Sequence, residues 1–164
     1  MKKILFWILP FTWMGIIYYA SSQPYEKQDI KPMMKVYDLS FLEPYLTWIS
    51  FTYHKSEISV QNLGVESFIE FFIRKGAHFT VFFILVILFF IAFKKTTALR
   101  TSIILIVSFF LSLAYAGVDE CHQGFTPNRT PYIGDVFIDG LGAFIACLCI
   151  WYIYRRDASK RSPF

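Results

Sequence analysis

Residues 77–93 read "AHFTVFFILVILFFIAF" and contain no Asp, Glu, Lys or Arg. A helix needs roughly 20 apolar residues to cross a bilayer, and about 17 can suffice. Residues 4–20, 101–118 and 136–154 are similarly apolar. The sequence therefore predicts four transmembrane helices.

The composition of the whole chain agrees with this prediction. Of its 164 residues, 55% are hydrophobic and 20% aromatic, and the mean hydropathy is positive. A soluble domain of this size rarely has such a composition. We predict an all-α membrane protein that forms a single domain over residues 1–164.

The positive charges gather at one end of the predicted helices. This end carries nine basic residues and one acidic residue, a net +8 in a chain whose total is +4: Lys2, Lys3, Lys94, Lys95, Arg100, Arg155, Arg156, Lys160 and Arg161, opposed by Asp157. Short cytoplasmic loops carry an excess of Lys and Arg. Both termini are therefore predicted to be cytoplasmic, and the modest net charge gives no case for a nucleic-acid partner.

The first apolar stretch follows "MKK" and so imitates a secretory signal peptide. Its apolar run is longer than a usual signal core, and cleavage after Ala20 would place bulky Tyr18 where a small residue is preferred. We expect an uncleaved first helix, with cleavage as the alternative. Cleavage would not change the orientation of the other helices.

Residues 21–64 form a long extracytoplasmic segment in this topology. Residues 33–51, "MMKVYDLSFLEPYLTWISF", are rich in aromatic side chains, which is typical of helices lying at the membrane interface. Residues 48–60, "WISFTYHKSEISV", alternate around a polar turn, which makes a small hairpin plausible. Whether the segment covers the outer helix ends is left open.

Charged side chains begin the second spanning helix at four-residue intervals. Glu66, Glu70, Arg74 and His78 share one helical face, and Glu70 precedes Arg74 in the order that favours an ion pair. The helix therefore extends over about 65–93. We expect the other helices at about 4–20, 101–122 and 133–154.

The outward ends of the last two helices also carry ionisable residues. Asp119, His122 and Gln123 share a face if the third helix continues that far, while Asp135 and Asp139 stand four apart in the fourth. Asp139 lies inside an apolar run, and an intramembrane carboxylate is a functional candidate by default. The candidate ligand-binding residues are Arg74, Lys75, His78, Asp119, Glu120, His122, Gln123, Arg129, Asp135 and Asp139. His78, Asp119 and His122 are the candidates for a catalytic role.

Small residues on the fourth helix favour close packing of this cluster. Gly140, Gly142, Ala143 and Ala146 give that helix a small-residue surface, and Gly142 and Ala146 have the spacing for close helix approach. Antiparallel neighbours joined by short connections can bring the three helix ends within reach of one another. Such packing would hold the carboxylates inward.

Other kinds of site have weaker support in the sequence. "DECH" at 119–122 resembles a nucleotide-hydrolysing motif, but no Gly-rich phosphate loop accompanies it. The acids and histidines could ligate a divalent metal, yet no spacing matches a dense metal motif, and we predict neither a metal nor a cofactor. A proton relay lacks a polar path through the cytoplasmic half. Three cysteines, with only Cys121 on the outer side, argue against an internal disulfide.

Four separated motifs resemble those of the VanZ-like family of small bacterial membrane proteins. "SSQP" (21–24), "RKGAHF" (74–79), "DECHQGFTPNRT" (119–130) and "GDVFIDGLG" (134–142) occur in the family's order. The resemblance implies that the motif residues are Arg74, Lys75, His78, Asp119, Glu120, His122, Gln123, Arg129 and Asp135. One departure is Asp139, where the family usually has Asn.

The resemblance implies an association with low-level resistance to teicoplanin and related lipoglycopeptides, without an established enzymatic activity. We expect a multi-pass protein of the cell membrane that binds membrane lipids, a lipid-linked cell-wall precursor or the lipoglycopeptide itself at the outer leaflet. The alternative is an intramembrane enzyme acting on a phosphate or glycosyl unit of a lipid carrier. A third hypothesis treats the cluster as an ion-pair network that fastens the helices. The oligomeric state is left open.

Overall fold

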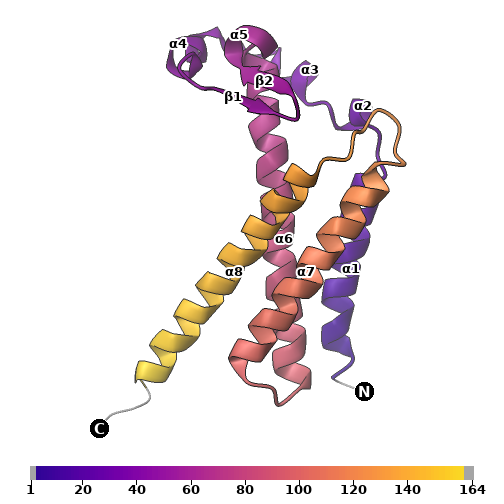
Figure 1. Cartoon of the computed structure of the whole chain (residues 1–164), viewed down its shortest axis with the longest axis vertical. Coiled ribbons are helices and arrows are strands. Elements are labelled where there is room, and N and C mark those ends of the chain that lie inside the picture. The colour runs from indigo at the N-terminus through magenta and orange to yellow at the C-terminus, as the bar shows by residue number, and fades with distance from the viewer. Residues whose placement is uncertain (1–2, 161–164) are drawn as a thin grey trace.

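The chain folds into four long helices and a compact connecting segment (Figure 1). The computed structural model describes the backbone of residues 3–160 and the side chains of residues 3–156. Of the charges counted above, Lys2 and Arg161 lie outside the described residues, as do the side chains of Asp157 and Lys160. The long helices are α1 (Leu5–Ser21), α6 (Val65–Thr96), α7 (Thr101–Gln123) and α8 (Ile133–Lys160). The all-α prediction is confirmed.

Three helices are long and apolar enough to cross a membrane: α6, α7 and residues Ile133–Arg156 of α8. Helix α1 passes the same test only together with the next short helices, Tyr25–Met34, which are bent from it by 113°. The described residues thus hold three candidate spans, or four if the bent pair counts as one. These helices support the prediction of a membrane protein. The orientation of the helix ends relative to the cytoplasm stays a prediction from the charge distribution.

The connecting segment, residues 22–64, is built from short elements. They are α2 (Tyr25–Gln28), α3 (Lys31–Met34), the 3-10 helix η1 (Ser40–Leu42), α4 (Glu43–Leu46), β1 (Ser50–Tyr53), β2 (Ser56–Ser59) and α5 (Val60–Leu63). The strands pair antiparallel, which confirms the expected hairpin. Its turn residues His54 and Lys55 both have positive φ, 48° and 64°, and this backbone matches the right-handed twist of paired strands.

A small apolar core fixes the connecting segment to the start of α6. Ile58 and Val60 are buried against Val65 and Phe68, which both lie in the first turns of α6. Helix α6 extends past its neighbours and carries the hairpin on its projecting end (Figure 1). The hairpin is therefore held at a set height above the other helix ends.

Helix α6 is central in the bundle, since it packs against α1, α7 and α8. Ala143 and Ala146 of α8 are fully buried in a core with Val86 of α6. At Gly142, a Cβ would lie 2.1 Å from the carbonyl oxygen of Phe79 in α6. The close approach predicted from the small residues is therefore present, and Gly142 is where the two backbones meet.

Replacing Gly142 should destabilise the protein. We expect Gly142→Ala to lower the free energy of unfolding by about 1–3 kcal/mol, because the added methyl group meets a backbone carbonyl that cannot rotate away. The matched control is Gly117→Ala in α7, where a Cβ would meet nothing within 4 Å. Thermal unfolding of both variants in one detergent measures the effect. Equal melting temperatures for the two variants would contradict this packing.

Candidate functional site

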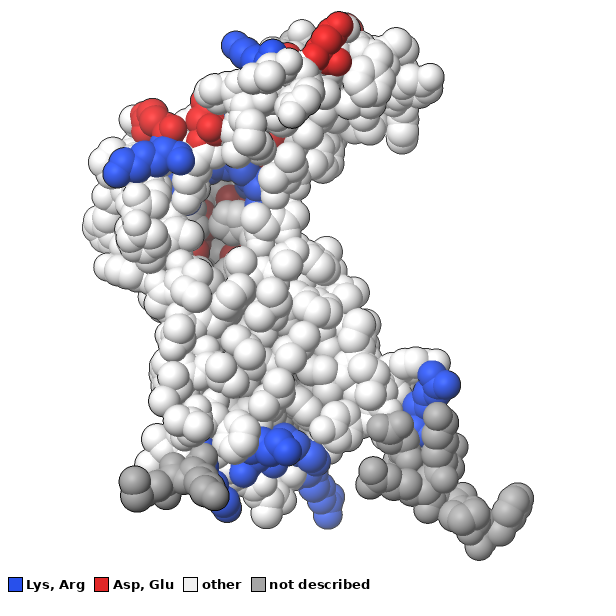
Figure 2. All heavy atoms as spheres, turned by 180° about the vertical axis from the view of Figure 1, so that it is seen from behind, with Lys and Arg blue, Asp and Glu red and all other residues white. Residues whose placement is uncertain are grey.

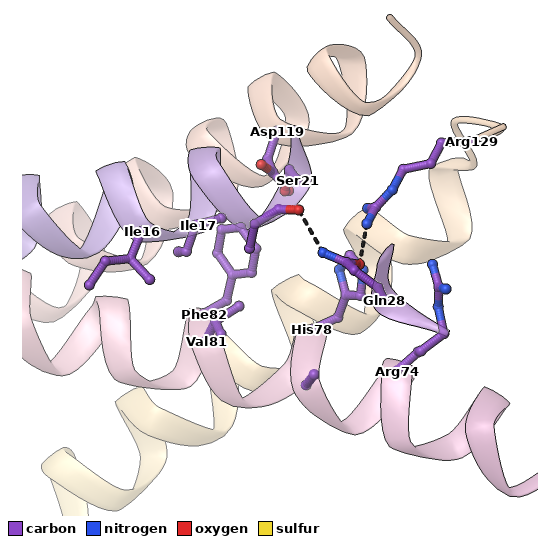
Figure 3. A pocket seen from close by; sticks show the side chains of 12 residues that line it. Ile16, Ile17, Ser21, Gln28, Arg74, His78, Val81, Phe82, Asp119 and Arg129 are labelled. Carbon is purple, nitrogen blue, oxygen red and sulfur yellow. Dashed lines mark hydrogen bonds between the residues drawn. The ribbon is translucent and has the colours of Figure 1, made fainter. Parts of the chain in front are cut away.

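The predicted cluster lies where α6 emerges from the bundle, beside the end of α7 and the start of α8. Helix α6 supplies Arg74, Lys75 and His78, and α7 supplies Asp119 and Gln123. The loop between α7 and α8 supplies Arg129, and helix α2 of the connecting segment closes one side with Gln28 (Figure 3). Residues far apart in the sequence thus meet at one level of the bundle.

Two glutamine amides hold the Arg129 guanidinium. Arg129 Nη1 donates to Gln123 Oε1 at 2.8 Å, and Nη2 donates to Gln28 Oε1. Gln123 donates its amide N–H to Asp119 Oδ2 at 3.0 Å, while Gln28 donates to the carbonyl of Ala20 at 2.7 Å. Each amide oxygen is thereby turned toward the arginine, so that Arg129 is positioned by neutral groups.

Arg74 is the second arginine of the site. Its Cζ lies 4.7 Å from the centroid of the Tyr25 ring, and its buried Nη1 has no hydrogen-bond partner among the described residues. Burial lowers the pKa of Arg129, and the positive charge of Arg74 lowers it further. An arginine nevertheless stays protonated in proteins, so two like charges face each other here.

The expected Glu70–Arg74 pair does not form. Glu70 Oε2 accepts a hydrogen bond from the Tyr25 hydroxyl at 3.0 Å and lies 3.7 Å from Lys31 Nζ. The spacing placed Glu70 and Arg74 on one face, but the connecting segment brings Tyr25 and Lys31 to that carboxylate instead. Within residues 3–156, Arg74 is left without a carboxylate partner.

The carboxylates of α8 pair with α6. His78 Nδ1 lies 3.1 Å from Asp139 Oδ1, and Lys75 Nζ donates to Asp135 Oδ1 at 2.5 Å. The Tyr53 hydroxyl of the hairpin also donates to Asp135. Burial and the neighbouring Asp135 carboxylate raise the pKa of Tyr53, so the phenol stays protonated as the donor. Lys75 and His78 therefore have acidic partners, whereas neither arginine does within the described residues.

Two cavities of about 280 Å³ each adjoin the cluster, a size near the lower end of ligand pockets, roughly 300 Å³. Arg74, His78 and Arg129 line both. The apolar cavity lies between α1 and α6, with Ile16, Ile17, Ala20, Ser21, Gln28, Ala77, Val81, Phe82 and Asp119 as its other lining residues. The polar cavity lies below the hairpin, with Tyr53, His54, Ser56, Ile58, Phe71, Lys75, Gln123, Asn128, Thr130, Tyr132 and Asp135.

The figures show how these groups are distributed. Arg74, Arg129, His78 and Gln28 gather at one end of the apolar cavity, and Ile16, Ile17, Val81 and Phe82 lie at the other (Figure 3). The surface is hollowed below the connecting segment, and basic and acidic atoms are visible inside that hollow (Figure 2). The charged groups are therefore reachable from outside the protein.

Three predicted residues line neither cavity: Asp139, which pairs with His78 as described above, and Glu120 and His122. His122 stacks on Tyr18 of α1 with a ring separation of 4.1 Å. Glu120 accepts a hydrogen bond from the backbone N–H of Tyr132 at 2.5 Å and so holds the chain just before α8. Their contacts fasten α7 to α1 and to the loop, and His122 is less suited than His78 to meet a ligand.

Four residues of the site were not predicted from the sequence: Gln28, Tyr53 and Tyr132, which line the cavities, and Tyr25, which lies against Arg74. The alternation of residues 48–60 predicted a hairpin but did not mark Tyr53 as part of the site, and residues 25–28 show no sustained pattern. One signal was present: the motif "SSQP" begins where the segment meets the loop, and Thr126 Oγ1 donates to the carbonyl of Ser21 at 3.1 Å. Two of the separated motifs are thus adjacent in space.

The ionisable and thiol groups offer no cluster suited to a metal ion within the described residues. Within residues 3–156, no three His, Cys, Asp or Glu side chains lie close enough together to hold a metal ion. Cys121, Cys147 and Cys149 are free thiols. The site as described offers arginine, histidine, carboxylate and amide chemistry.

The family model described as VanZ/LLP1 matches residues 6–155, nearly the whole chain. No curated protein and no solved structure matches.

The His78–Asp139 pair allows a test of whether stability requires the negative charge of Asp139 or only a hydrogen-bonding group of its shape. Asp139→Asn keeps an oxygen and an N–H for His78 Nδ1, and we expect a melting temperature close to that of the parent. Asp139→Leu leaves the imidazole nitrogen buried without a partner, which should lower the free energy of unfolding by about 1–3 kcal/mol. Thermal unfolding in detergent compares them. Equal loss in both variants would show that the ionised carboxylate is required.

Proposed function

This chain belongs to the VanZ/LLP1 family, and on that premise we propose that it is a cell-envelope membrane protein that binds the anionic group of a lipid-linked or glycopeptide ligand through Arg74 and Arg129. One observation supports this most. Both guanidinium groups lie at the junction of two cavities, and no carboxylate pairs with either one among the described residues.

The energetics favour an anion at this junction. A charge that is partly removed from water without an acidic partner is unfavourable. Both arginines are partly buried, and the charge of Arg74 is close enough to act on Arg129. A structural network would pair them with acids, as it pairs Lys75 with Asp135. Guanidinium groups are well suited to bind phosphate or carboxylate through paired hydrogen bonds.

The neutral partners of Arg129 support the same proposal. Gln28 and Gln123 fix the guanidinium without cancelling its charge, and Arg129 Nε is buried with no hydrogen-bond partner in the described part of the chain. Asp119 accepts a hydrogen bond from the amide of Gln123 and not from Arg129, so that it and Glu120 act on the arginine only as nearby charges. The positive charge is therefore held in place and remains available to a ligand.

The membrane side follows from the charge distribution. Lys94, Lys95 and Arg100 lie at the opposite end of the bundle from the cavities, and an excess of basic residues favours the cytoplasmic side. The cavities then open at the outer leaflet of the cell membrane. A ligand in that position is a lipid headgroup, a lipid-linked wall precursor or a lipoglycopeptide such as teicoplanin.

A second candidate function is an intramembrane enzyme acting on a phosphate or glycosyl unit of a lipid carrier. Asp139 engages His78 Nδ1, and His78 lines both cavities beside the arginines. A histidine oriented by a carboxylate can act as a general base through its other ring nitrogen. This observation favours His78 over His122 in a catalytic role.

The arginines provide the test of binding. In phosphatidylcholine nanodiscs that contain phosphatidylglycerol, we expect Arg74→Gln and Arg129→Gln each to weaken retention of the anionic lipid about tenfold or more, because a charge-assisted hydrogen bond contributes about 1.5–3 kcal/mol. Native mass spectrometry measures the bound lipid. Arg74→Lys keeps the charge and guards against a loss caused by misfolding.

The matched control is Arg100→Gln, an exposed arginine at the other end of the bundle. It removes the same charge and should leave retention of the anionic lipid unchanged. If all three glutamine variants lose the lipid equally, general surface charge accounts for binding. If well-folded Arg74→Gln and Arg129→Gln retain it fully, the proposed site is wrong.

His78→Gln separates binding from catalysis. Purified protein is incubated with radiolabelled lipid-linked wall precursor in nanodiscs, and both binding and product release are followed. On the binding proposal we expect no turnover by the parent, with ligand retained by His78→Gln. Turnover by the parent that His78→Gln abolishes would instead establish the enzyme.

A further inference from the structure

The two cavities differ in chemistry although they share Arg74, His78 and Arg129. We infer that a single amphiphile lies across both, with one hydrocarbon chain in the apolar cavity, its anionic group between the arginines, and an uncharged hydrogen-bonding headgroup in the polar cavity. This inference rests on the proposed function for the anionic group. It adds the class of ligand and the direction in which the ligand lies.

The apolar cavity has the lining that a hydrocarbon chain requires. Its far end is formed by Ile16 and Ile17 of α1 and by Val81 and Phe82 of α6. Val81 and Phe82 belong to the uninterrupted apolar run of α6, so this end lies at the depth of lipid tails. Water is scarce at that depth, and an apolar chain fills such a space favourably.

The same cavity has an opening toward the lipid. Ile16 is 51% exposed, and two further lining residues, Ala20 of α1 and Ala77 of α6, are also exposed. Small side chains at these two positions leave room between the helices. A chain can therefore enter sideways from the bilayer without passing through water.

The polar cavity is lined by hydrogen-bonding groups with little uncompensated charge away from the arginines. The hairpin contributes the Tyr53 hydroxyl and Ser56, and the loop contributes Asn128 and Thr130. Lys75 and Asp135 neutralise each other there. Donors and acceptors of this kind recognise hydroxyl groups rather than a second charge.

Aromatic rings add a flat surface to the polar cavity. The rings of His54 and Tyr132 lie with centroids 4.5 Å apart, tilted by 30°, and Tyr53 packs edge-on to Tyr132 at 4.8 Å. Such rings provide apolar contact beside polar edges. A polyol or sugar-like group, with C–H faces and hydroxyl edges, matches this combination.

The position of the arginines fixes the order of groups along the ligand. A molecule that extends from one cavity into the other must carry its anionic group between chain and headgroup. A phosphodiester linking a hydrocarbon tail to a polyol has this order. Phosphatidylglycerol is a probe with all three parts, phosphatidic acid lacks the polyol, and glycerol 3-phosphate lacks the chain.

The test uses the full chain in phosphatidylcholine nanodiscs. Phosphatidylglycerol carrying a photoreactive diazirine on one acyl chain should crosslink to the apolar cavity, at residues near Ile16 and Val81. Ala77→Phe fills this cavity and should reduce crosslinking there about tenfold. The control Ala114→Phe places the same ring at an exposed position of α7 that lines neither cavity and should leave crosslinking unchanged.

The headgroup is tested by competition between the three probes. We expect phosphatidylglycerol to bind at least about tenfold more tightly than phosphatidic acid, and both to exceed glycerol 3-phosphate. Thr130→Phe, which narrows the polar cavity, should remove the preference for phosphatidylglycerol while leaving phosphatidic acid bound. Thr47→Phe, an exposed threonine that lines neither cavity, is the control.

The outcomes separate this inference from the proposed function. One outcome would contradict a ligand that occupies both cavities but would still support anion binding by the arginines. In that outcome, phosphatidylglycerol and phosphatidic acid bind equally, their binding depends on the arginines, and Ala77→Phe has no effect. Binding of glycerol 3-phosphate as tight as that of the lipids would assign the site to a soluble anion. Absence of any arginine-dependent binding would overturn both.

Discussion

The contact between Gly142 of α8 and the backbone of Phe79 in α6 is the constraint on which the rest of the structure depends. A side chain at position 142 has no room, so the two helices approach as closely as their backbones allow. Phe79 follows His78, and Asp139 precedes Gly142 by three residues on the same helical face. Backbone contact therefore brings the Asp139 carboxylate beside the His78 ring, where Oδ1 and Nδ1 lie within hydrogen-bond distance.

A second principle concerns how the protein treats positive charge. Lys75 has a carboxylate partner across the α6–α8 interface, whereas Arg129 is held by neutral amides. Pairing neutralises a charge, and amide contacts orient it without doing so. At the same level of the bundle, the charge of Lys75 is thus neutralised by a carboxylate, whereas the charge of Arg129 is oriented and not neutralised.

The sequence predicted what depends on local periodicity and failed where distant segments decide. Apolar runs predicted the long helices, and four-residue spacing placed Arg74 and His78 on one face. The same spacing suggested an ion pair with Glu70, which instead binds Tyr25 and Lys31 because the connecting segment folds back over α6. Gln28 lies in that segment, where no period exists to mark it, so its place beside Arg129 required the tertiary structure.

Helix α6 is also longer than a membrane is thick. Its 32 residues span about 48 Å at 1.5 Å per residue, against a hydrocarbon core of about 30 Å. One continuous rod therefore carries both the hairpin above the surface and the apolar wall within the bilayer. Thickness of the surrounding lipid sets how far this rod is immersed, and hence the height of Arg74 relative to the plane of lipid phosphates. A change in bilayer composition that alters its thickness therefore changes the depth of Arg74 in the membrane through hydrophobic mismatch. This effect does not require a ligand.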